Sequence, residues 1–364
     1  MNKKPQKERV LLAMSGGLDS SVSAILLLEQ GYDLVGVTMV VWDYESAGGV
    51  APESGCCNLE AINDARKVAV DLGFPHYVLD MRKKFEEKII SNFISEYLSA
   101  RTPNPCVLCN KLMKWDDLLQ KADELNCKYI ATGHYARIVF ENGRYFLRKG
   151  LDSNKDQSYV LWALSQEHLS RTILPLGTYE KSQIREIAIQ HKLLKIAKKS
   201  ESYEICFIPD DDYRGFLKRH TPGLEEKVEG GNFVDTNGKV LGKHHGYPFY
   251  TIGQRKGLGI AVGHPLYVAR IDAEKNLVVL AEREKLLTNE LYADRVNLMK
   301  YDDFATMDHI LCRIRYRDKG MMATVTKTGD ELHVVFQDPV AAVTPGQSVV
   351  LYQGDDVIGG GFIR

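Results

Sequence analysis

Short apolar runs alternate with longer amphipathic segments over about the first 200 residues of the chain. The short runs are rich in β-branched residues and predict strands at residues 10–14, 34–42, 76–79, 129–132 and 204–208. The longer segments space their apolar positions as helices do, and they predict helices at residues 20–30, 59–72, 85–99, 112–125, 159–164 and 181–191. Because strands and helices alternate, we predict an α/β fold with a doubly wound parallel sheet.

The pattern departs from this alternation in two places. Runs at residues 137–140 and 145–148 flank Asn142-Gly143, a pair that favours a type I′ turn and predicts an inserted hairpin. Beyond about residue 210, glycine-rich, helix-poor sequence predicts a small β-containing domain, and alternating runs then predict an antiparallel β-barrel or sandwich at residues 323–327, 332–336 and 348–352. We therefore expect three domains, at residues 1–212, 213–286 and 287–364.

The composition narrows the class of protein. The chain has 364 residues, 44% of them hydrophobic, which is enough for a large core and more than one domain. It has no run of about 18 apolar residues, and the first apolar run ends at Ser15, too early for a secretory signal. Seven unevenly spaced cysteines are typical of reduced thiols. We therefore expect a cytoplasmic protein with no membrane partner.

The charge pattern bears on nucleic-acid binding. A formal net charge of −1 excludes a protein that is basic over its whole surface. Local basic clusters are present at Lys195, Lys198 and Lys199; Lys243, His244 and His245; Arg255 and Lys256; and Arg313, Arg315, Arg317 and Lys319. Any RNA binding has to come from such local patches, although each cluster alone is more often a solvated face than a binding site.

Residues 15–21 read Ser-Gly-Gly-Leu-Asp-Ser-Ser and lie between the first predicted strand and the first predicted helix. Adjacent glycines let backbone N–H groups approach an anion, and serines add hydroxyl donors at the first helical turn, so phosphate is the expected ligand. The sequence lacks the Gly-Lys-Ser/Thr ending of a Walker loop. The segment instead resembles the pyrophosphate loop (PP-loop) of the ATP pyrophosphatases. Met39 and Gly133-His134 also fall at the carboxyl ends of predicted strands, where such sheets bind ligands.

Two cysteines are candidates for chemistry. Prolines in and just before the segment Asn104-Pro105-Cys106-Val107-Leu108-Cys109-Asn110 disfavour a helix, so we expect an extended loop up to Leu112. Cys109 would then lie near a helix N-terminus, where the dipole lowers the pKa of a thiol. Cys206 lies near the end of the predicted strand at residues 204–208, so the two thiols are expected to share one crevice.

Other roles for the cysteines are weaker alternatives. A zinc site at Cys106 and Cys109 needs two more ligands, and the nearby Cys56-Cys57 pair is adjacent rather than spaced for chelation. An iron–sulfur cluster on three thiols and a thioredoxin-type exchange stay open as hypotheses. Cys57, Cys127 and Cys312 lie in apolar runs and are expected to be buried.

Together these segments resemble the tRNA-specific 2-thiouridylases, the MnmA/TrmU family, which modify the wobble uridine of certain tRNA anticodons. The resemblance covers nearly the whole chain rather than one motif. The segments that carry it are residues 15–21, residues 101–111, Ala131-Thr132-Gly133-His134-Tyr135-Ala136, Lys155-Asp156-Gln157-Ser158-Tyr159, Ile205-Cys206-Phe207-Ile208, Thr251-Ile252-Gly253-Gln254-Arg255-Lys256-Gly257, Arg315-Tyr316-Arg317 and Val343-Thr344-Pro345-Gly346-Gln347. It implies an ATP-binding catalytic domain first and a tRNA-contacting barrel last.

The resemblance also assigns roles to residues. Cys109 falls on the family's nucleophile and Cys206 on its persulfide cysteine, which implies a transient disulfide between them. The implied nucleotide contacts are Ser15, Gly16, Gly17, Leu18, Asp19, Ser20, Ser21, Met39 and Gly133. The implied tRNA contacts are Asn104, Pro105, Cys106, His134, Lys155, Asp156, Gln157, Arg315, Tyr316 and Gln347. Family members carry an aspartate, proposed to move protons, at the position of Cys106, so that acid–base role is open here.

The implied reaction replaces the 2-oxygen of the wobble uracil by sulfur. ATP would convert this oxygen to an adenylate so that AMP can leave, and Asp19 would hold Mg²⁺ beside the phosphates. A persulfide-carrying donor protein would load Cys206, whose terminal sulfur would reach the activated carbon directly or after release by Cys109. Two other functions stay open: an amidating or ligating ATP pyrophosphatase, which needs neither Cys109 nor Cys206, and a non-enzymatic tRNA-binding or redox adaptor.

Overall fold

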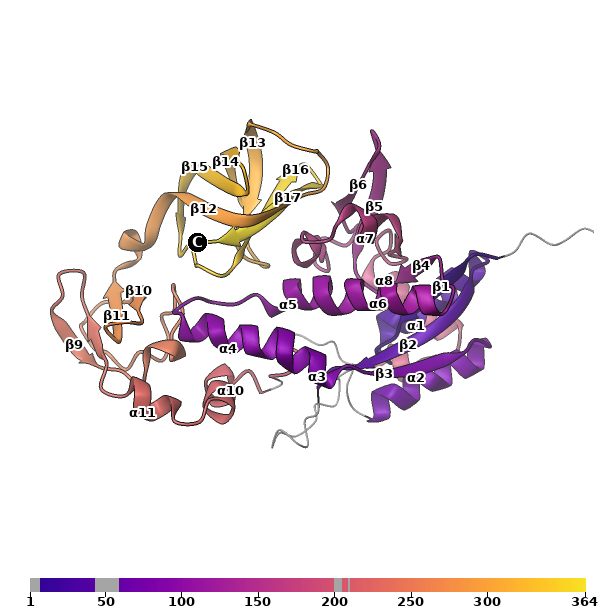
Figure 1. Cartoon of the computed structure of the whole chain (residues 1–364), viewed down its shortest axis with the longest axis horizontal. Helices are drawn as coiled ribbons and strands as arrows, with labels where there is room; N and C mark the ends of the chain where they lie inside the picture. Colours follow the sequence, from indigo (N-terminus) through magenta and orange to yellow (C-terminus); the bar gives the residue numbers. More distant parts are fainter. Residues whose placement is uncertain (1–6, 43–58, 200–204, 209) are drawn as a thin grey trace, which may run out of the picture. The chain divides into compact units, whose positions relative to one another are not determined.

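The computed structural model describes residues 7–42, 59–199, 205–208 and 210–364 (Figure 1). The chain divides into two compact units. The first unit contains Met1–Ile89, Cys106–Pro209 and Asp355–Ile358. The second contains Ile90–Pro105, Asp210–Gly354 and Gly359–Arg364. Each unit therefore combines segments from distant parts of the sequence. Within the described residues, no helix is long and apolar enough to cross a membrane.

A five-stranded parallel sheet with the order β3-β2-β1-β4-β7 forms the centre of the first unit. Its strands are β1 (Arg9–Ala13), β2 (Asp33–Val40), β3 (His76–Asp80), β4 (Tyr129–Ala131) and β7 (Thr172–Ile173). Val10, Leu11 and Leu12 of β1 are fully buried, as expected of a central strand covered on both faces. The parallel sheet and four of its five predicted strands are confirmed.

The strand predicted at residues 204–208 is wrong, and β7 takes the fifth place in the sheet. Glu204 lies outside the described residues, and Cys206 and Phe207 lie in a turn. Phe207 is buried, with its ring centroid 5.6 Å from that of Phe85 and 6.2 Å from that of Trp42. Aromatic packing therefore buries this apolar segment without strand pairing, and it leaves Cys206 exposed.

Several helices pack on the sheet as their apolar spacing predicts. The helices α1 (Leu18–Glu29), α2 (Leu59–Leu72), α8 (Lys181–Gln190) and α9 (Leu194–Ala197) share one apolar core with β1. The remaining helical elements between β3 and β7 are α3 (Arg82–Phe85), the π-helical η1 (Glu86–Ile90), α4 (Ser91–Leu98), the 3₁₀-helical η3 (Ser158–Leu161) and α7 (Gln166–Ser170), besides the helix described next.

The helix predicted from Leu112 begins earlier, at Pro105. The elements α5 (Pro105–Leu108), the π-helical η2 (Cys109–Asp116) and α6 (Asp117–Glu124) follow one another without a break. Proline is tolerated at the first helical position because the N–H that it lacks would be unpaired there anyway. The predicted extended loop is therefore wrong from Pro105 onward, and Cys109 lies one turn inside the helix rather than at its start.

The predicted hairpin is confirmed as β5 (Ala136–Glu141) and β6 (Arg144–Lys149). Asn142 and Gly143 have φ values of 52° and 79°, as a type I′ turn requires. Arg148 of β6 pairs with Asp356, and its Nε lies 2.5 Å from the carboxylate. The first unit thus includes a few residues from near the end of the chain.

The second unit contains a four-stranded sheet with the order β10-β11-β8-β9. Its strands are β8 (Asn232–Val234), β9 (Val240–Lys243), β10 (Tyr267–Asp272) and β11 (Leu277–Ala281), and a 3₁₀ turn, η4 (Tyr247–Phe249), follows β9. Two helices, α10 (Tyr213–His220) and α11 (Leu224–Val228), precede it, so the expectation of helix-poor sequence is wrong there. Asp212 caps α10, and buried Phe216 packs against Phe93 of α4 at 5.8 Å between ring centroids.

The end of the chain forms the predicted antiparallel barrel, which follows the 3₁₀ turn η5 (Arg283–Leu286). Its strands are β12 (Leu287–Leu298), β13 (Thr306–Arg313), β14 (Met321–Thr328), β15 (Glu331–Ala341), β16 (Ser348–Gln353) and β17 (Asp356–Ile363). Their order is β12-β15-β14-β13-β16-β17, and pairing of β12 with β17 closes it. Closure leaves no unpaired edge strand, and alternate residues such as Leu332, Val334 and Phe336 fill the interior.

Candidate active site

The glycine-rich loop joins β1 to α1 at the carboxyl edge of the sheet in the first unit. Gly16 has a φ of +70°, which only glycine adopts without strain, and Gly17 precedes α1 without a side-chain cap. Ser20 Oγ accepts a hydrogen bond from Ser15 N at 3.2 Å, and Ser21 Oγ donates to Gly17 O at 2.8 Å. These two buried hydroxyls brace the loop from inside, so backbone N–H groups remain its main donors for an anion.

Close backbone approaches fix the position of this loop. A Cβ on Gly16 would lie 2.0 Å from Ala61 O of α2, and a Cβ on Gly133 would lie 3.0 Å from Cβ of Asp19. Gly133, just after β4, therefore lets this strand end directly against the first turn of α1. Met39 lies half-buried near the end of the neighbouring strand β2. The residues predicted to contact nucleotide are thus collected at one edge of one sheet, as expected for a doubly wound fold.

Asp19, in the first turn of α1, is held by two residues that sequence reasoning missed. Lys181 Nζ lies 2.6 Å from Oδ1 and 2.8 Å from Oδ2 of Asp19. Tyr135 OH donates to Oδ1 at 2.7 Å, and Lys181 Nζ lies 5.4 Å from the centre of the Tyr135 ring. A lysine at the first position of α8 opposes the helix dipole, and this was the available signal that an anionic partner lies nearby.

A second lysine contacts the loop from the other side. Lys199 Nζ donates to Gly16 O at 2.9 Å and lies 2.6 Å from the carboxylate of Asp64 on α2. Burial alone would raise the pKa of Asp64, but hydrogen bonds from Lys199 and Lys195 hold this pKa below its usual value. The loop therefore lies between two ion pairs, one at Asp19 and one at Asp64.

His134, predicted to contact tRNA, is buried in the first unit. Its Nδ1 lies 2.7 Å from Thr132 Oγ1 and its Nε2 lies 3.5 Å from Lys114 Nζ. An ammonium group can only donate, so Nε2 accepts and Nδ1 carries the proton. Burial and the nearby Lys114 charge hold the pKa of His134 well below its usual value, so this imidazole is neutral.

The segment predicted to contact tRNA at Lys155, Asp156 and Gln157 also has internal hydrogen bonds. Asp156 is buried, and its carboxylate accepts hydrogen bonds from Gly150 N, Ser158 N and Ser158 Oγ at 3.1, 3.1 and 2.9 Å. Gln157 Oε1 accepts from Tyr135 N at 3.0 Å. Asp156 and Gln157 thus organise the loop, and Gln157 holds the residue that hydrogen-bonds Asp19.

The structure places the candidate thiols differently from the sequence prediction. Cys109 is partly exposed at the start of η2, and the adjacent Asn110 is buried and donates from Nδ2 to Val160 O at 2.9 Å. Cys106 lies in the first turn of α5, and desolvation raises the pKa of its thiol, which the nearby Lys114 charge only partly offsets. Cys206 is exposed in its turn. Cys127 and Cys312 are buried as expected, and Cys56 and Cys57 lie outside the described residues.

Gln347, another predicted tRNA contact, holds the chain that leads to Cys106. In the second unit, Gln347 Nε2 donates to Thr102 O at 3.2 Å and to Pro103 O at 2.9 Å. Thr102 N donates to Pro345 O at 2.8 Å. Asn104 and Pro105, also predicted contacts, come next in the chain. The barrel therefore holds the backbone at Thr102 and Pro103 within the second unit.

Arg315 and Tyr316 lie after β13 of the barrel. The Arg315 guanidinium donates to Ile252 O, Ala342 O and Thr344 Oγ1 at 3.2, 3.0 and 3.0 Å. It therefore links the central sheet region to the barrel within the second unit. Tyr316 is 39% exposed, so its ring is accessible to a partner.

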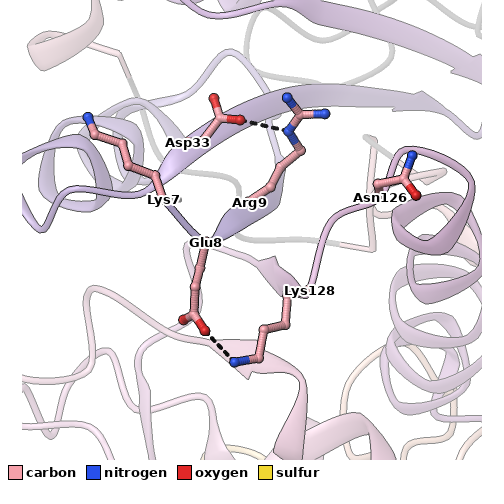
Figure 2. A pocket seen from close by; sticks show the side chains of 6 residues that line it. All are labelled: Lys7, Glu8, Arg9, Asp33, Asn126 and Lys128. Atoms are coloured by element: carbon pink, nitrogen blue, oxygen red, sulfur yellow. Dashed lines mark hydrogen bonds and ion pairs between the residues drawn. The ribbon is translucent and has the colours of Figure 1, made fainter. Parts of the chain in front are cut away.

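A separate hollow of about 610 Å³ lies at the opposite, amino-terminal edge of the parallel sheet (Figure 2). Its lining residues are Lys7, Glu8, Arg9, Asp33, Asn126 and Lys128. Arg9 Nε lies 2.7 Å from Asp33, and Lys128 pairs with Glu8. Because these charges are paired and the hollow is not at the carboxyl edge, we do not place the nucleotide there.

Among the described residues, no group of three or more His, Cys, Asp or Glu side chains is arranged to hold a metal ion without a ligand's help. The carboxylate of Asp19, in the first turn of α1, is a group that could bind a divalent cation together with phosphate oxygens. The fold and the loop define a nucleotide-binding α/β protein of the PP-loop class.

Comparisons with known proteins agree with this class. Family models described as a tRNA methyl transferase HUP domain, a tRNA methyl transferase PRC-barrel domain and an aminomethyltransferase beta-barrel domain match residues 8–210, 214–282 and 288–363. A tRNA-specific 2-thiouridylase MnmA of Amoebophilus asiaticus is 58% identical over 99% of this chain and 96% of its own length. That of Cytophaga hutchinsonii is 54% identical over 99% and 98%. The chain belongs to the tRNA-specific 2-thiouridylase family.

Proposed function

We propose that the protein catalyses ATP-dependent 2-thiolation of the wobble uridine in tRNA anticodons. The observation that carries this proposal is that relatives named tRNA-specific 2-thiouridylase match the whole chain, at 58% and 54% identity. The braced loop at the start of α1 and the exposed thiols support it, because the reaction needs both an activated phosphate and a sulfur nucleophile.

In this proposal the phosphates of ATP bind the N–H groups at the start of α1, and Ser15, Leu18, Met39 and Gly133 lie around the nucleotide. Asp19 is the residue that would hold Mg²⁺, which when bound supplies positive charge against the phosphates. The 2-oxygen of uracil attacks the α-phosphorus, pyrophosphate leaves, and the carbon then carries AMP as its leaving group. The helix dipole of α1 favours the negative charge that develops there.

The sulfur comes from a persulfide on Cys206, loaded by a persulfide-carrying donor protein. Its terminal sulfur forms a bond to C2 of uracil while the bond from C2 to the AMP oxygen breaks. The Cys109 thiolate then attacks Sγ of Cys206, which releases the 2-thiouridine and leaves a Cys109–Cys206 disulfide. Two electrons from an external thiol reduce this disulfide before the next turnover, so we propose a reducing, cytoplasmic location.

For the tRNA, we propose that Asn104, Pro105, Cys106, His134, Lys155, Arg315 and Tyr316 lie at the interface. Asp156, Gln157 and Gln347 support it by holding the loops described above. An unstacked anticodon base costs only a few kcal/mol to extrude, so modest contacts elsewhere on the tRNA are enough.

The test is incubation of the protein with unmodified tRNA, ATP and sulfide, which can attack the adenylated carbon directly and displace AMP, followed by mass spectrometry of the nucleosides. We expect 2-thiouridine that depends on ATP, and none with Asp19→Ala, whose substitution removes a carboxylate beside the loop rather than a packed apolar group. ATP-dependent AMP formation that needs ammonia or an amino acid and gives no thiouridine would instead indicate an amidating or ligating enzyme.

A further inference from the structure

Lys181 is a cation beside the loop that has no role in the reaction proposed above. Its side chain is only 12% exposed, and its Nζ contacts both carboxylate oxygens of Asp19. The ammonium group lies over the Tyr135 ring, with Nζ 5.4 Å from the ring centroid. The charged group is thus fixed beside the first turn of α1, next to the loop that has the geometry of an anion site.

Stabilisation of the fold is a poor explanation for this cation. An ion pair removed from water gains little net free energy, because desolvation offsets the attraction between the charges. Lys181 is also the first residue of α8, where the helix dipole disfavours positive charge. A structural role would be served as well by an apolar residue packed on Tyr135. The position is better explained by a negatively charged ligand.

Charge balance suggests how the pair responds to a ligand. In the structure, Lys181 and Asp19 neutralise each other, and Tyr135 OH provides a second, neutral partner for Asp19. A nucleotide polyphosphate brings negative charge to the loop, and its divalent cation brings positive charge. Every charge is paired if the two residues exchange partners. The Asp19 carboxylate then binds the divalent cation, and the Lys181 ammonium binds a phosphate oxygen.

We propose that Lys181 is a phosphate-binding residue, and that Asp19 and Tyr135 hold it ready beside the loop before nucleotide binds. The proposal rests on the proposed function only in assuming that the loop binds a nucleotide. Lys199, which donates to Gly16 O, is held by Asp64 on the other side and stays in its ion pair. Lys181 is therefore the lysine that ligand binding releases from its carboxylate.

The test measures nucleotide binding by calorimetry in the full-length protein without tRNA, with ATP and with adenosine as ligands. Lys181→Met keeps an unbranched side chain of similar length and removes the charge. We expect it to weaken ATP binding about tenfold or more, the loss of one hydrogen bond to a charged group, and to leave adenosine binding unchanged. Lys181→Arg should retain part of the ATP affinity because it keeps a cation.

Lys128→Met is the matched control. Lys128 also pairs with a carboxylate, that of Glu8, and also lies over a tyrosine ring, that of Tyr129 at 4.9 Å, but at the opposite edge of the sheet. It should bind ATP as the unchanged protein does. Equal ATP affinity in Lys181→Met and the unchanged protein would overturn the inference, and so would an equal loss of ATP and adenosine. If the unchanged protein bound no ATP, the proposed function itself would fail.

Discussion

The protonation state of His134 is set by its surroundings. Its ring is buried beside Trp115, with 5.6 Å between ring centroids, and each ring nitrogen has a hydrogen-bond partner. Burial disfavours the charged imidazolium, and the Lys114 cation adds repulsion, so the pKa is well below that of an unfolded chain. His134 is therefore neutral at neutral pH and unsuited to act there as a general acid.

This lowered pKa predicts a pH dependence of stability. Above the unfolded value near 6.5, neither state binds the proton, and the His134 contribution is complete. As the pH falls below about 6.5, His134 becomes protonated in the unfolded chain but stays neutral in the native state. The free energy of unfolding therefore falls by up to about 1.4 kcal/mol per pH unit for this one group.

The His134→Asn variant keeps a donor toward Thr132 but cannot titrate, so it should lose less stability than the unchanged protein between pH 7.5 and 5.5. Urea unfolding at the two pH values measures this, and His76, His168 and His244, whose pKa values are also lowered, remain as a common background. A difference between the two proteins that does not change with pH would show that His134 titrates normally.

The thiols give a second prediction for single residues. Cys109→Ser and Cys206→Ser should each abolish thiolation while ATP and tRNA binding persist, because each removes a sulfur that the reaction needs. Cys106→Ser should stay at least partly active, since a thiol is a poor sole proton carrier. Peptide mapping after one turnover with a persulfide-carrying donor and no added reductant should find Cys109 linked to Cys206. A Cys106–Cys109 linkage with Cys206 still a thiol would instead indicate a Cys-x-x-Cys exchange.

Motifs within a few residues of one another could be found from the sequence, but partners far along the chain could not. Ser15 to Ser21 carry their own signal, because a turn rich in glycine between a strand and a helix has few other uses. Lys181 lies 162 residues from Asp19, and no spacing rule joins them. The structural roles of Asp156 and Gln347 could not be found from the sequence either. A polar side chain that hydrogen-bonds to the backbone cannot be told apart, in sequence, from one that contacts RNA.

Residues of the barrel contact the segment that follows α4, at Arg101, Thr102 and Pro103. Arg101 forms an ion pair with Glu96 at 2.9 Å and donates to Ile363 O at 3.2 Å, and Gln347 holds the next carbonyls. A Cβ on Gly346 would lie 2.6 Å from Thr102 O, so the two backbones are in direct contact. These contacts fix the backbone of residues 101–103 against the barrel within the second unit.

A substitution at Gln347 tests this support. Gln347→Glu replaces a donor by a carboxylate that faces two carbonyl oxygens, so we expect a loss of about 1–3 kcal/mol in the free energy of unfolding and slower thiolation. Gln353→Glu is the control, because Gln353 accepts from Lys300 and Tyr301 through Oε1 and a carboxylate preserves that role. Denaturant unfolding compares the two. If Gln347→Glu kept full stability and lost only tRNA affinity, Gln347 would be a direct tRNA contact.

The periodic elements were predictable and the irregular ones were not. The α2 helix begins and ends at the predicted residues, and the Asn142-Gly143 turn has the predicted geometry, because periodicity and turn chemistry are local. The early start of the helix at Pro105 was missed because proline disfavours a helix before it but favours the first helical position. The strand expected at residues 204–208 was wrong because aromatic packing of Phe207 explains the same apolar residues.

On the scale of the whole molecule, the two units do not follow simple sequence boundaries. Residues 90–105 belong with the central sheet and barrel, and Asp355–Ile358 belong with the nucleotide-binding unit. Removing the chain after about residue 290 would therefore also remove Asp356, the partner of Arg148, and the support of Thr102. Point substitutions are better tests of the barrel than truncation, since loss of function after truncation would have several causes.

In the proposed reaction, ATP activates the uracil 2-oxygen, which sulfur then replaces. Oxygen tracing tests it most directly: tRNA whose wobble uridine carries ¹⁸O at the 2-position is incubated with ATP, sulfide and the protein, and the AMP formed is analysed by mass spectrometry. We expect one ¹⁸O in AMP for each 2-thiouridine made, because the adenylated oxygen leaves with the phosphate. Thiouridine formed with ¹⁸O released to water, or without AMP, would contradict it.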